Sequence, residues 1–468
     1  MLYRIETIDK TTTDVKILSP TLHFYSYMLR QGFNETDRTL NLRRKLFNDN
    51  LEKIAAILKT SAGETAANFL KLLPPEEELM ASFGTVLDLT KAPAECLKPN
   101  SDRLYFNTGL IHSRLAARCL NDTYFLRLTR YLPSALGEQS LDSFEKLAEG
   151  VNNLQIELGQ TAILAGMLNG EYSKEEKRAI AATCLSKFCG SEVSPEALTA
   201  NEFLGSQFYF YPQPVTVKLF NEVAVEAVNL TCVFLYENQT AERQADKVYR
   251  TFQNLLWSYH KIHYFYSQSV LLKKFLGKEY ATLERLTEEY AENKLNGKVW
   301  KELPYNYLEY QKQLSFLGDQ LQLVEVNSSN YGECLRQMEK DTGEKAPQFL
   351  AEFEEINRFY REQMKSNIAF MKPAIAIFEK LMLSVQTQVN LEEAEARQKQ
   401  LRQQAKLGQI IAGVGSAIAL LQILTPLLAA TLPPSAINLW LAALGSLIVS
   451  VGMGFGIGAI AFRWLRDG

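Results

Sequence analysis

The sequence predicts a mostly α-helical protein with a smaller α/β region at its N-terminus. A long stalk helix is predicted to be continuous with the first of two C-terminal transmembrane helices. Two uncharged runs, 407–430 and 439–462, follow each other closely near the C-terminus. No proline lies between Pro373 and Pro426, so one helix can continue into the first run. Segments rich in β-branched and aromatic residues lie before Thr240 and predict strands.

The composition is typical of a folded protein, with 47% apolar and 22% charged residues. The formal net charge of −3 gives no basic surplus, so we expect no direct nucleic-acid binding. Six cysteines lack the spacing of a zinc knuckle and predict free thiols in a reducing compartment. The first residues contain no apolar signal-peptide core, which predicts a body that stays in the cytosol.

Residues 1–237 are predicted to form an α/β cytosolic domain. Partial alternation of apolar residues predicts strands at Val15–Leu18, Phe208–Tyr211, Val215–Leu219, Val223–Val228 and Thr231–Tyr236. Asp142 and Glu145 have the spacing of a helix start, and this helix is expected to run to about Leu168. Ser173 and Glu176 have the spacing of a capping box and predict the start of the next helix.

Residues 238–371 are predicted to form a helical cytosolic region, followed by a stalk helix over 372–406. The first long helix should run from Thr240 to about Leu276. Its coiled-coil-like face consists of Val248, Phe252, Leu255, Tyr259, Ile262 and Tyr266. The upper stalk repeats apolar residues in the same way, at Phe378, Met382, Val385 and Val389.

The two uncharged runs, 407–430 and 439–462, are predicted to be transmembrane helices. A helix over 407–430 would reach roughly 36 Å, and a hydrocarbon core is about 30 Å thick. The loop 431–438 contains two consecutive prolines, and 463–468 form a short tail. Basic residues flank both runs and are absent from the loop. This pattern predicts a protein of the inner (plasma) membrane with both termini cytoplasmic.

Each predicted span has one distinctive face. Small residues that allow close helix packing recur in the second run, at Ala442, Ser446, Ser450, Gly454 and Gly458, with Gly452 and Gly456 beside them. Candidate pore-lining residues are Gly415, Ile418, Gln422 and Thr425 of the first run and Asn438 of the loop. A hydrogen bond between helices is the alternative role of Gln422.

Catalytic motifs are absent from the sequence, and we do not expect an enzyme. The phosphate-binding loop, the nucleophile elbow and the paired-histidine zinc motif are all missing. His260 and His263 are three residues apart, but no cysteine or carboxylate has a helpful spacing. Metal and ligand-binding residues are therefore unassigned. Carboxylate clusters such as Glu288–Glu289 are typical of solvated helix faces. A regulatory divalent-cation site is the alternative interpretation.

The layout resembles that of the CorA magnesium-transporter superfamily. That resemblance implies a homopentamer whose stalks and first spans line a pore. The family's Gly-Met-Asn signature is missing, because its expected place reads Thr431-Leu-Pro-Pro-Ser-Ala-Ile-Asn438. Gly452-Met453-Gly454 lies in the second run instead. Divergent CorA-like proteins without the signature include membrane effectors of type III CRISPR systems, in which a nucleotide messenger opens the channel.

Taken together, these features predict a homo-oligomeric, CorA-like membrane channel controlled by its large cytosolic domain. The resemblance favours an anti-phage effector gated by a nucleotide second messenger. A Mg²⁺ transporter and a non-conducting membrane-anchored scaffold are the alternatives. The expected partners are the lipid bilayer and further copies of the chain, with a pentamer favoured. No cofactor is assigned, and a divalent cation or a nucleotide is the candidate ligand.

Overall fold

The computed structural model describes residues 15–30, 37–57, 95–96, 104–120, 122–151, 154–155, 157–218, 224–292, 297–429 and Gly445. The chain divides into two compact units, Met1–Lys380 and Leu381–Gly468. The finer domain boundaries expected from the sequence stay predictions.

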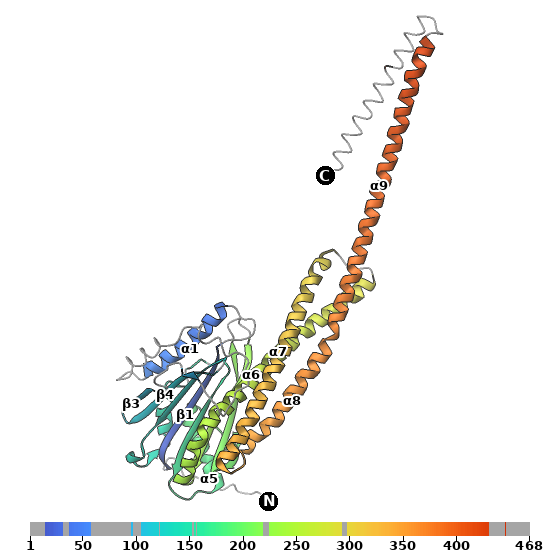
Figure 1. Cartoon of the computed structure of the whole chain (residues 1–468). Helices are drawn as coiled ribbons and strands as arrows, with labels where there is room; N and C mark the ends of the chain where they lie inside the picture. The colour runs from blue at the N-terminus through green and yellow to red at the C-terminus, as the bar shows by residue number, and fades with distance from the viewer. Residues whose placement is uncertain are drawn as a thin grey trace, which may run out of the picture. The chain divides into compact units, whose positions relative to one another are not determined.

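A mixed β-sheet forms the centre of the first unit (Figure 1). Its strands lie in the order β2-β4-β5-β1-β7-β10-β9-β8, with β3 beside β4 and β6 beside β1. The strands are β1 Lys16–Leu29, β2 Glu95–Cys96, β3 Leu104–Thr108, β4 Ile111–Leu120, β5 Thr123–Tyr131, β6 Gln139–Ser140, β7 Gly159–Leu168, β8 Thr199–Phe203, β9 Ser206–Lys218 and β10 Ala224–Tyr236.

The central strand β1 pairs antiparallel with both β5 and β7. Its register with β7 shifts between Leu18 and Thr21. Pro20 lies in this interval and has no N–H to donate, and Ser19 has a φ of 52°. After this bulge the pairing is regular to the end of β1. By contrast, β7 and β10 pair parallel, with β8 and β9 in the connection between them.

Among the described elements, one face of the sheet is covered by α1 Asp37–Ile57, α4 Ser143–Ala148 and α5 Lys174–Cys189. Alternate residues of β1, namely Leu22, Phe24 and Met28, are buried in the same core cluster as residues of these helices. Helix α5 starts with the predicted capping box, because Ser173 and Glu176 exchange hydrogen bonds with each other's backbone N–H groups. That helix start is confirmed.

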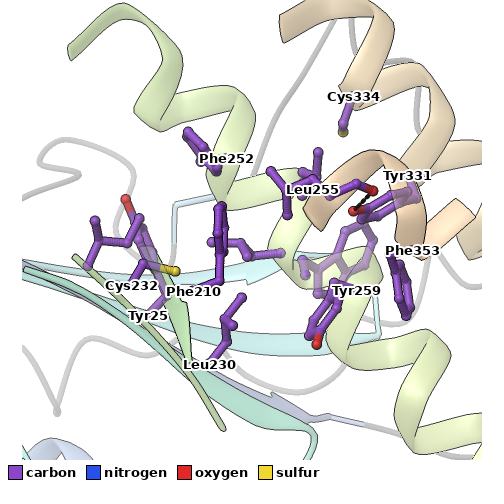
Figure 2. Packing of buried hydrophobic residues seen from close by; sticks show 14 of the residues in the cluster. Tyr25, Phe210, Leu230, Cys232, Phe252, Leu255, Tyr259, Tyr331, Cys334 and Phe353 are labelled. Atoms are coloured by element: carbon purple, nitrogen blue, oxygen red, sulfur yellow. Dashed lines mark hydrogen bonds between the residues drawn. The ribbon is translucent and has the colours of Figure 1, made fainter. Parts of the chain in front are cut away.

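Helices α6 Gln239–Ala291, α7 Gly297–Thr342 and α8 Gln348–Met371 form a second core with the opposite face of the sheet. Figure 2 shows Phe210 and Leu230 of the sheet facing Phe252, Leu255 and Tyr259 of α6. Burying one such side chain contributes about 1.5–3 kcal/mol. This cluster includes the face predicted for the helix from Thr240, and that helix is confirmed, although it extends to Ala291.

The helix predicted from Asp142 to about Leu168 is wrong in its second half. Helix α4 ends at Ala148, and Gly159–Leu168 form strand β7. This strand lies between β1 and β10, and both of its faces are apolar because Ala162 and Leu164 belong to the core on one side of the sheet and Ile163 and Ala165 to the core on the other. A continuous apolar run is typical of a fully buried strand, and its periodicity does not distinguish it from a buried helix.

Helix α9, Pro373–Ala429, is one uninterrupted helix that begins at the predicted proline and contains the predicted stalk. Its first turns belong to the first unit and pack on α7. Phe378 is buried, and its ring centroid lies 5.5 Å from that of Tyr310. The Tyr307 hydroxyl donates a 2.8 Å hydrogen bond to the Glu379 carboxylate.

The predicted membrane spans require a correction. In the part of the chain that the structure describes, no helix combines the length and the apolar character needed to cross a bilayer. Of the uncharged run that begins at Leu407, the structure describes the side chains of 407–413, Gly415, Ala419 and Ile423. The fold class with transmembrane helices, the inner-membrane location and the ion-channel assignment are wrong on this finding. The predicted second span, 439–462, lies outside the described residues except for Gly445.

Candidate functional site

The candidate site residues predicted from the sequence are concentrated in and after α9. Gly415 lies in α9 and is exposed. Ile418, Gln422 and Thr425 belong to the same helix, but their side chains lie outside the described part. Asn438 and the predicted packing residues Ala442, Ser446, Ser450, Gly452, Gly454, Gly456 and Gly458 also lie outside it. The arrangement of these candidate residues therefore lies outside the described part of the chain.

The apolar face predicted for the upper stalk is partly used within the chain. Phe378 packs against α7, and Met382 and Val385 are half-buried. Val389, the last member, is 39% exposed. This face therefore begins as an internal contact of the first unit rather than as a free coiled-coil surface.

A different face of α9 is exposed and free of charge. It consists of Thr387, Leu391, Ala394, Gln398, Leu401 and Ala405, which alternate steps of four and three residues. Such steps keep side chains on one side of a helix. Leu391 and Leu401 are 60% and 64% exposed. We call these six residues the α9 stripe.

Every charged residue of α9 between Leu391 and Lys406 lies off the stripe. These residues are Glu392, Glu393, Glu395, Arg397, Lys399, Arg402 and Lys406. Arg397 and Glu393 form an ion pair at 3.7 Å along the helix surface. Because all of these residues are exposed, solvation alone does not explain why one face lacks charge. Segregation of this kind is typical of a helix that packs against another helix.

No family model and no curated protein matches this chain. The resemblance to the CorA superfamily therefore rests on the layout of the sequence alone, and it stays a prediction.

Buried polar contacts hold the part of α6 from Gln253 to Lys261 against the sheet. The Lys261 ammonium donates to both carboxylate oxygens of Asp122, at 2.6 and 2.7 Å. The Trp257 Nε1–H donates to the Thr123 hydroxyl at 3.0 Å, and this hydroxyl donates to Asp122 at 2.9 Å. Further along, the Tyr27 hydroxyl donates to the backbone carbonyl of Gln253. Helix α6 also packs along α7, so it links the sheet to the other helices of the first unit.

The two histidines considered as metal ligands lie in different apolar surroundings. A ring nitrogen of His260 is 2.7 Å from the Thr161 hydroxyl, and burial lowers the pKa of His260 to about 3. The His263 ring packs against Phe353 and Tyr360, and burial lowers its pKa to about 4. Both rings are neutral near pH 7. The described part of the chain shows no group of three or more metal-ligating side chains.

The thiols and carboxylates also have structural roles where they are described. Cys184, Cys232 and Cys334 are buried and free, and burial raises the pKa of Cys334 to about 12. Such a thiol stays protonated and is a poor nucleophile. Glu289 and Glu355 form ion pairs with arginines of their own helices. These contacts provide no acid–base pair and no activated nucleophile.

Proposed function

We propose that this chain is a non-enzymatic, homo-oligomeric effector whose N-terminal body controls an assembly formed through α9. The observation that carries this proposal is the α9 stripe, an exposed, uncharged heptad face on a helix with seven charges around it. Its partner must be another helix with the same repeat. A second copy of α9 supplies one, and closed homo-oligomers are the commonest protein assemblies.

The side chains of the stripe favour close helix approach. Leu391 and Leu401 provide apolar contacts, and Ala394 and Ala405 are small enough to let two helix backbones come near each other. Gln398 places one uncharged amide in the middle, where it can pair with the same residue of a neighbouring copy. A single polar residue at a core position specifies register and subunit number. The pentamer expected from the sequence is our working subunit number.

Control of the assembly by the N-terminal body is supported by the contacts that α6 makes with the sheet and with α7. This helix is tied to the sheet by a buried ion pair and packs along α7. The first turns of α9 contact α7 in turn, through Tyr310 and Phe378. A ligand that changes the contacts between α6 and the sheet would act on elements that continue into α9. The nucleotide messenger suggested by the sequence layout is the first ligand class to test.

The proposal is tested by the mass of the full-length chain in solution. We expect wild type to form a homo-oligomer of about five subunits in light scattering after size exclusion. Leu401→Lys places a charge from every copy into the shared core, and the dissociation constant should rise at least about tenfold. Gln403→Lys introduces the same side chain on the opposite side of α9 and should leave the mass unchanged. A monomeric wild type, or equal masses for both variants, would refute assembly through the stripe.

A further inference from the structure

The chain passes from α8 to α9 with a single residue between the two helices. Helix α8 ends at Met371 and α9 begins at Pro373, and Lys372 between them has right-handed helical dihedrals, with a φ of −56° and a ψ of −39°. The backbone therefore continues to turn as in one helix. Pro373 has no N–H, however, so it donates no hydrogen bond to the carbonyl of Ala369, four residues back. We call residues 371–375 the α8–α9 joint.

Backbone hydrogen bonds change their spacing at the joint. The Lys372 N–H donates to the Ile368 carbonyl at 2.9 Å, with the regular spacing of four residues. The Ile375 N–H donates to the Lys372 carbonyl at 3.2 Å, only three residues back, which is the spacing of a 3-10 turn. Sharp bends in helices almost always occur at prolines or where the regular ladder is interrupted. The joint has both features and is therefore the place where this helical segment can bend.

A buried tyrosine of α7 holds the joint from the side. The Tyr310 hydroxyl donates a 2.8 Å hydrogen bond to the backbone carbonyl of Met371. Tyr310 is fully buried and Met371 is 3% exposed, so water does not readily replace this donor. A buried carbonyl that loses its hydrogen-bond donor is strongly unfavourable. The bond therefore fixes the last residue of α8 against α7 at the point where the ladder is interrupted.

The same tyrosine also packs against the first turns of α9. The Phe378 ring centroid lies 5.5 Å from that of Tyr310 and 6.0 Å from that of Tyr307. Within residues 373–380, the part of α9 that belongs to the first unit, Ala374 and Phe378 are the buried residues. This part of α9 is thus attached through two buried side chains that lie directly after the joint.

A second tyrosine of α7 makes a similar hydrogen bond in a different environment. The Tyr307 hydroxyl donates to the Glu379 carboxylate at 2.8 Å, but this bond is exposed. Water competes for both partners of an exposed hydrogen bond, so such a bond contributes little to stability. The two tyrosines therefore offer the same chemical group against α9, one buried and one exposed. The buried bond of Tyr310 is the one that can hold the joint.

We propose that Tyr310 and Met371 form a latch, whose release frees residues 374–380 from α7 while the rest of the first unit stays folded. Release breaks one buried hydrogen bond and exposes two side chains, whereas the cores on the two faces of the sheet keep all their contacts. Segments with few buried contacts open locally at a lower free energy than the whole domain. The interrupted ladder at the joint lets α9 move without unwinding α8.

The consequence of the latch for assembly rests on the proposed function. A closed homo-oligomer needs every copy to present α9 in the same way. A closed latch fixes the start of α9 before association, whereas an open latch leaves freedom that association has to remove. The latch is therefore the contact through which the N-terminal body favours assembly through α9.

The test is hydrogen exchange of the full-length chain, followed by mass spectrometry. Tyr310→Phe keeps the ring and removes the hydroxyl, so the amides of 374–380 should exchange at least about fivefold faster. The amides of α5 should be unchanged, because this helix lies in the core on the other face of the sheet. Tyr307→Phe is the matched control on the same helix, and its effect on 374–380 should stay below about twofold.

Two exchange results would overturn the latch. One is equal exchange of 374–380 in Tyr310→Phe and Tyr307→Phe. The other is an equal increase in α5, since the hydroxyl would then serve the whole fold. The same comparison in the Leu401→Lys background shows the latch without assembly through the α9 stripe, so the latch can hold where the proposed assembly fails.

Light scattering over a dilution series tests the role of the latch in control. Tyr310→Phe should raise the dissociation constant of the assembly at least about threefold, and Tyr307→Phe should leave it unchanged. An unchanged dissociation constant in Tyr310→Phe, together with faster exchange of 374–380, would overturn control through the latch. A monomeric wild type would refute the proposed assembly instead, and hydrogen exchange would still decide whether the latch exists.

Discussion

Replacing Lys261 tests whether a buried ion pair holds α6 to the sheet. Lys261 and Asp122 have side-chain exposures of 4% and 8%, and the ammonium lies 4.8 Å from the centroid of the Trp257 ring. Lys261→Met keeps most of the apolar stem and removes the charge. Asp122 then keeps only the Thr123 hydroxyl as a side-chain donor among the described contacts. An uncompensated buried charge of this kind destabilises a protein by about 3–5 kcal/mol.

The measurement is urea unfolding of the full-length chain, followed by far-UV circular dichroism. We expect Lys261→Met to lower the free energy of unfolding by about 3–5 kcal/mol, a large share of the total for an ordinary domain. Adding Asp122→Asn removes the stranded charge, so the double variant should regain more than half of the loss. That recovery separates the cost of an unpaired charge from the lost packing of the lysine stem.

An exposed ion pair of the same helix provides the control. Arg285 and Glu289 are 59% and 31% exposed, and such pairs contribute at most about 1 kcal/mol. Arg285→Met should therefore lower the free energy of unfolding by less than that amount. The reasoning is refuted if Lys261→Met costs no more than Arg285→Met, or if the double variant is as unstable as the single one.

Two further predictions concern the surroundings of two histidines of α6, His260 and His263. Gly159 has a φ of 150°, and a Cβ there would lie 2.3 Å from the His260 Nδ1 and 2.7 Å from the Val228 carbonyl oxygen. Gly159→Ala should cost about 2–4 kcal/mol in urea unfolding, whereas Gly318→Ala, with open space around it, should be neutral or slightly stabilising. Burial lowers the pKa of His263 to about 4 from 6.5, so the unfolded chain takes up this proton first as the pH falls. The free energy of unfolding should therefore decrease from pH 6.5 towards pH 4, and His263→Gln should make that decrease shallower by up to about 1.4 kcal/mol per pH unit. Parallel pH profiles for wild type and His263→Gln would show that His263 is not responsible.

Long amphipathic helices and local caps were predictable from the sequence. The apolar repeat from Val248 to Tyr266 identified α6, since a helix with one apolar face shows its period over many turns. The capping box at Ser173 identified the start of α5, since both partners lie within one turn. Strands β9 and β10 were found in part because they are rich in aromatic and β-branched residues.

Features that depend on the neighbours of a segment were not predictable. Gly159–Leu168 is an apolar run with no period that distinguishes strand from helix, and only its place between β1 and β10 makes it a strand. The run from Leu407 was expected to span a membrane because of its length and its lack of charge, and the described residues contradict that expectation. The sequence also did not show what the apolar stalk face contacts, and its first residue, Phe378, packs against Tyr310 of α7.

The α9 stripe could have been found from the sequence by asking which face avoids charge. An apolar repeat identifies the face that packs within the chain, and in α9 that repeat ends as the charged residues begin. Beyond that point the informative feature is the absence of charge at Leu391, Ala394, Gln398 and Leu401. A charge on a face that packs against another helix would lose its water, which is costly. A helix that uses one face for packing therefore keeps its charges on the other faces.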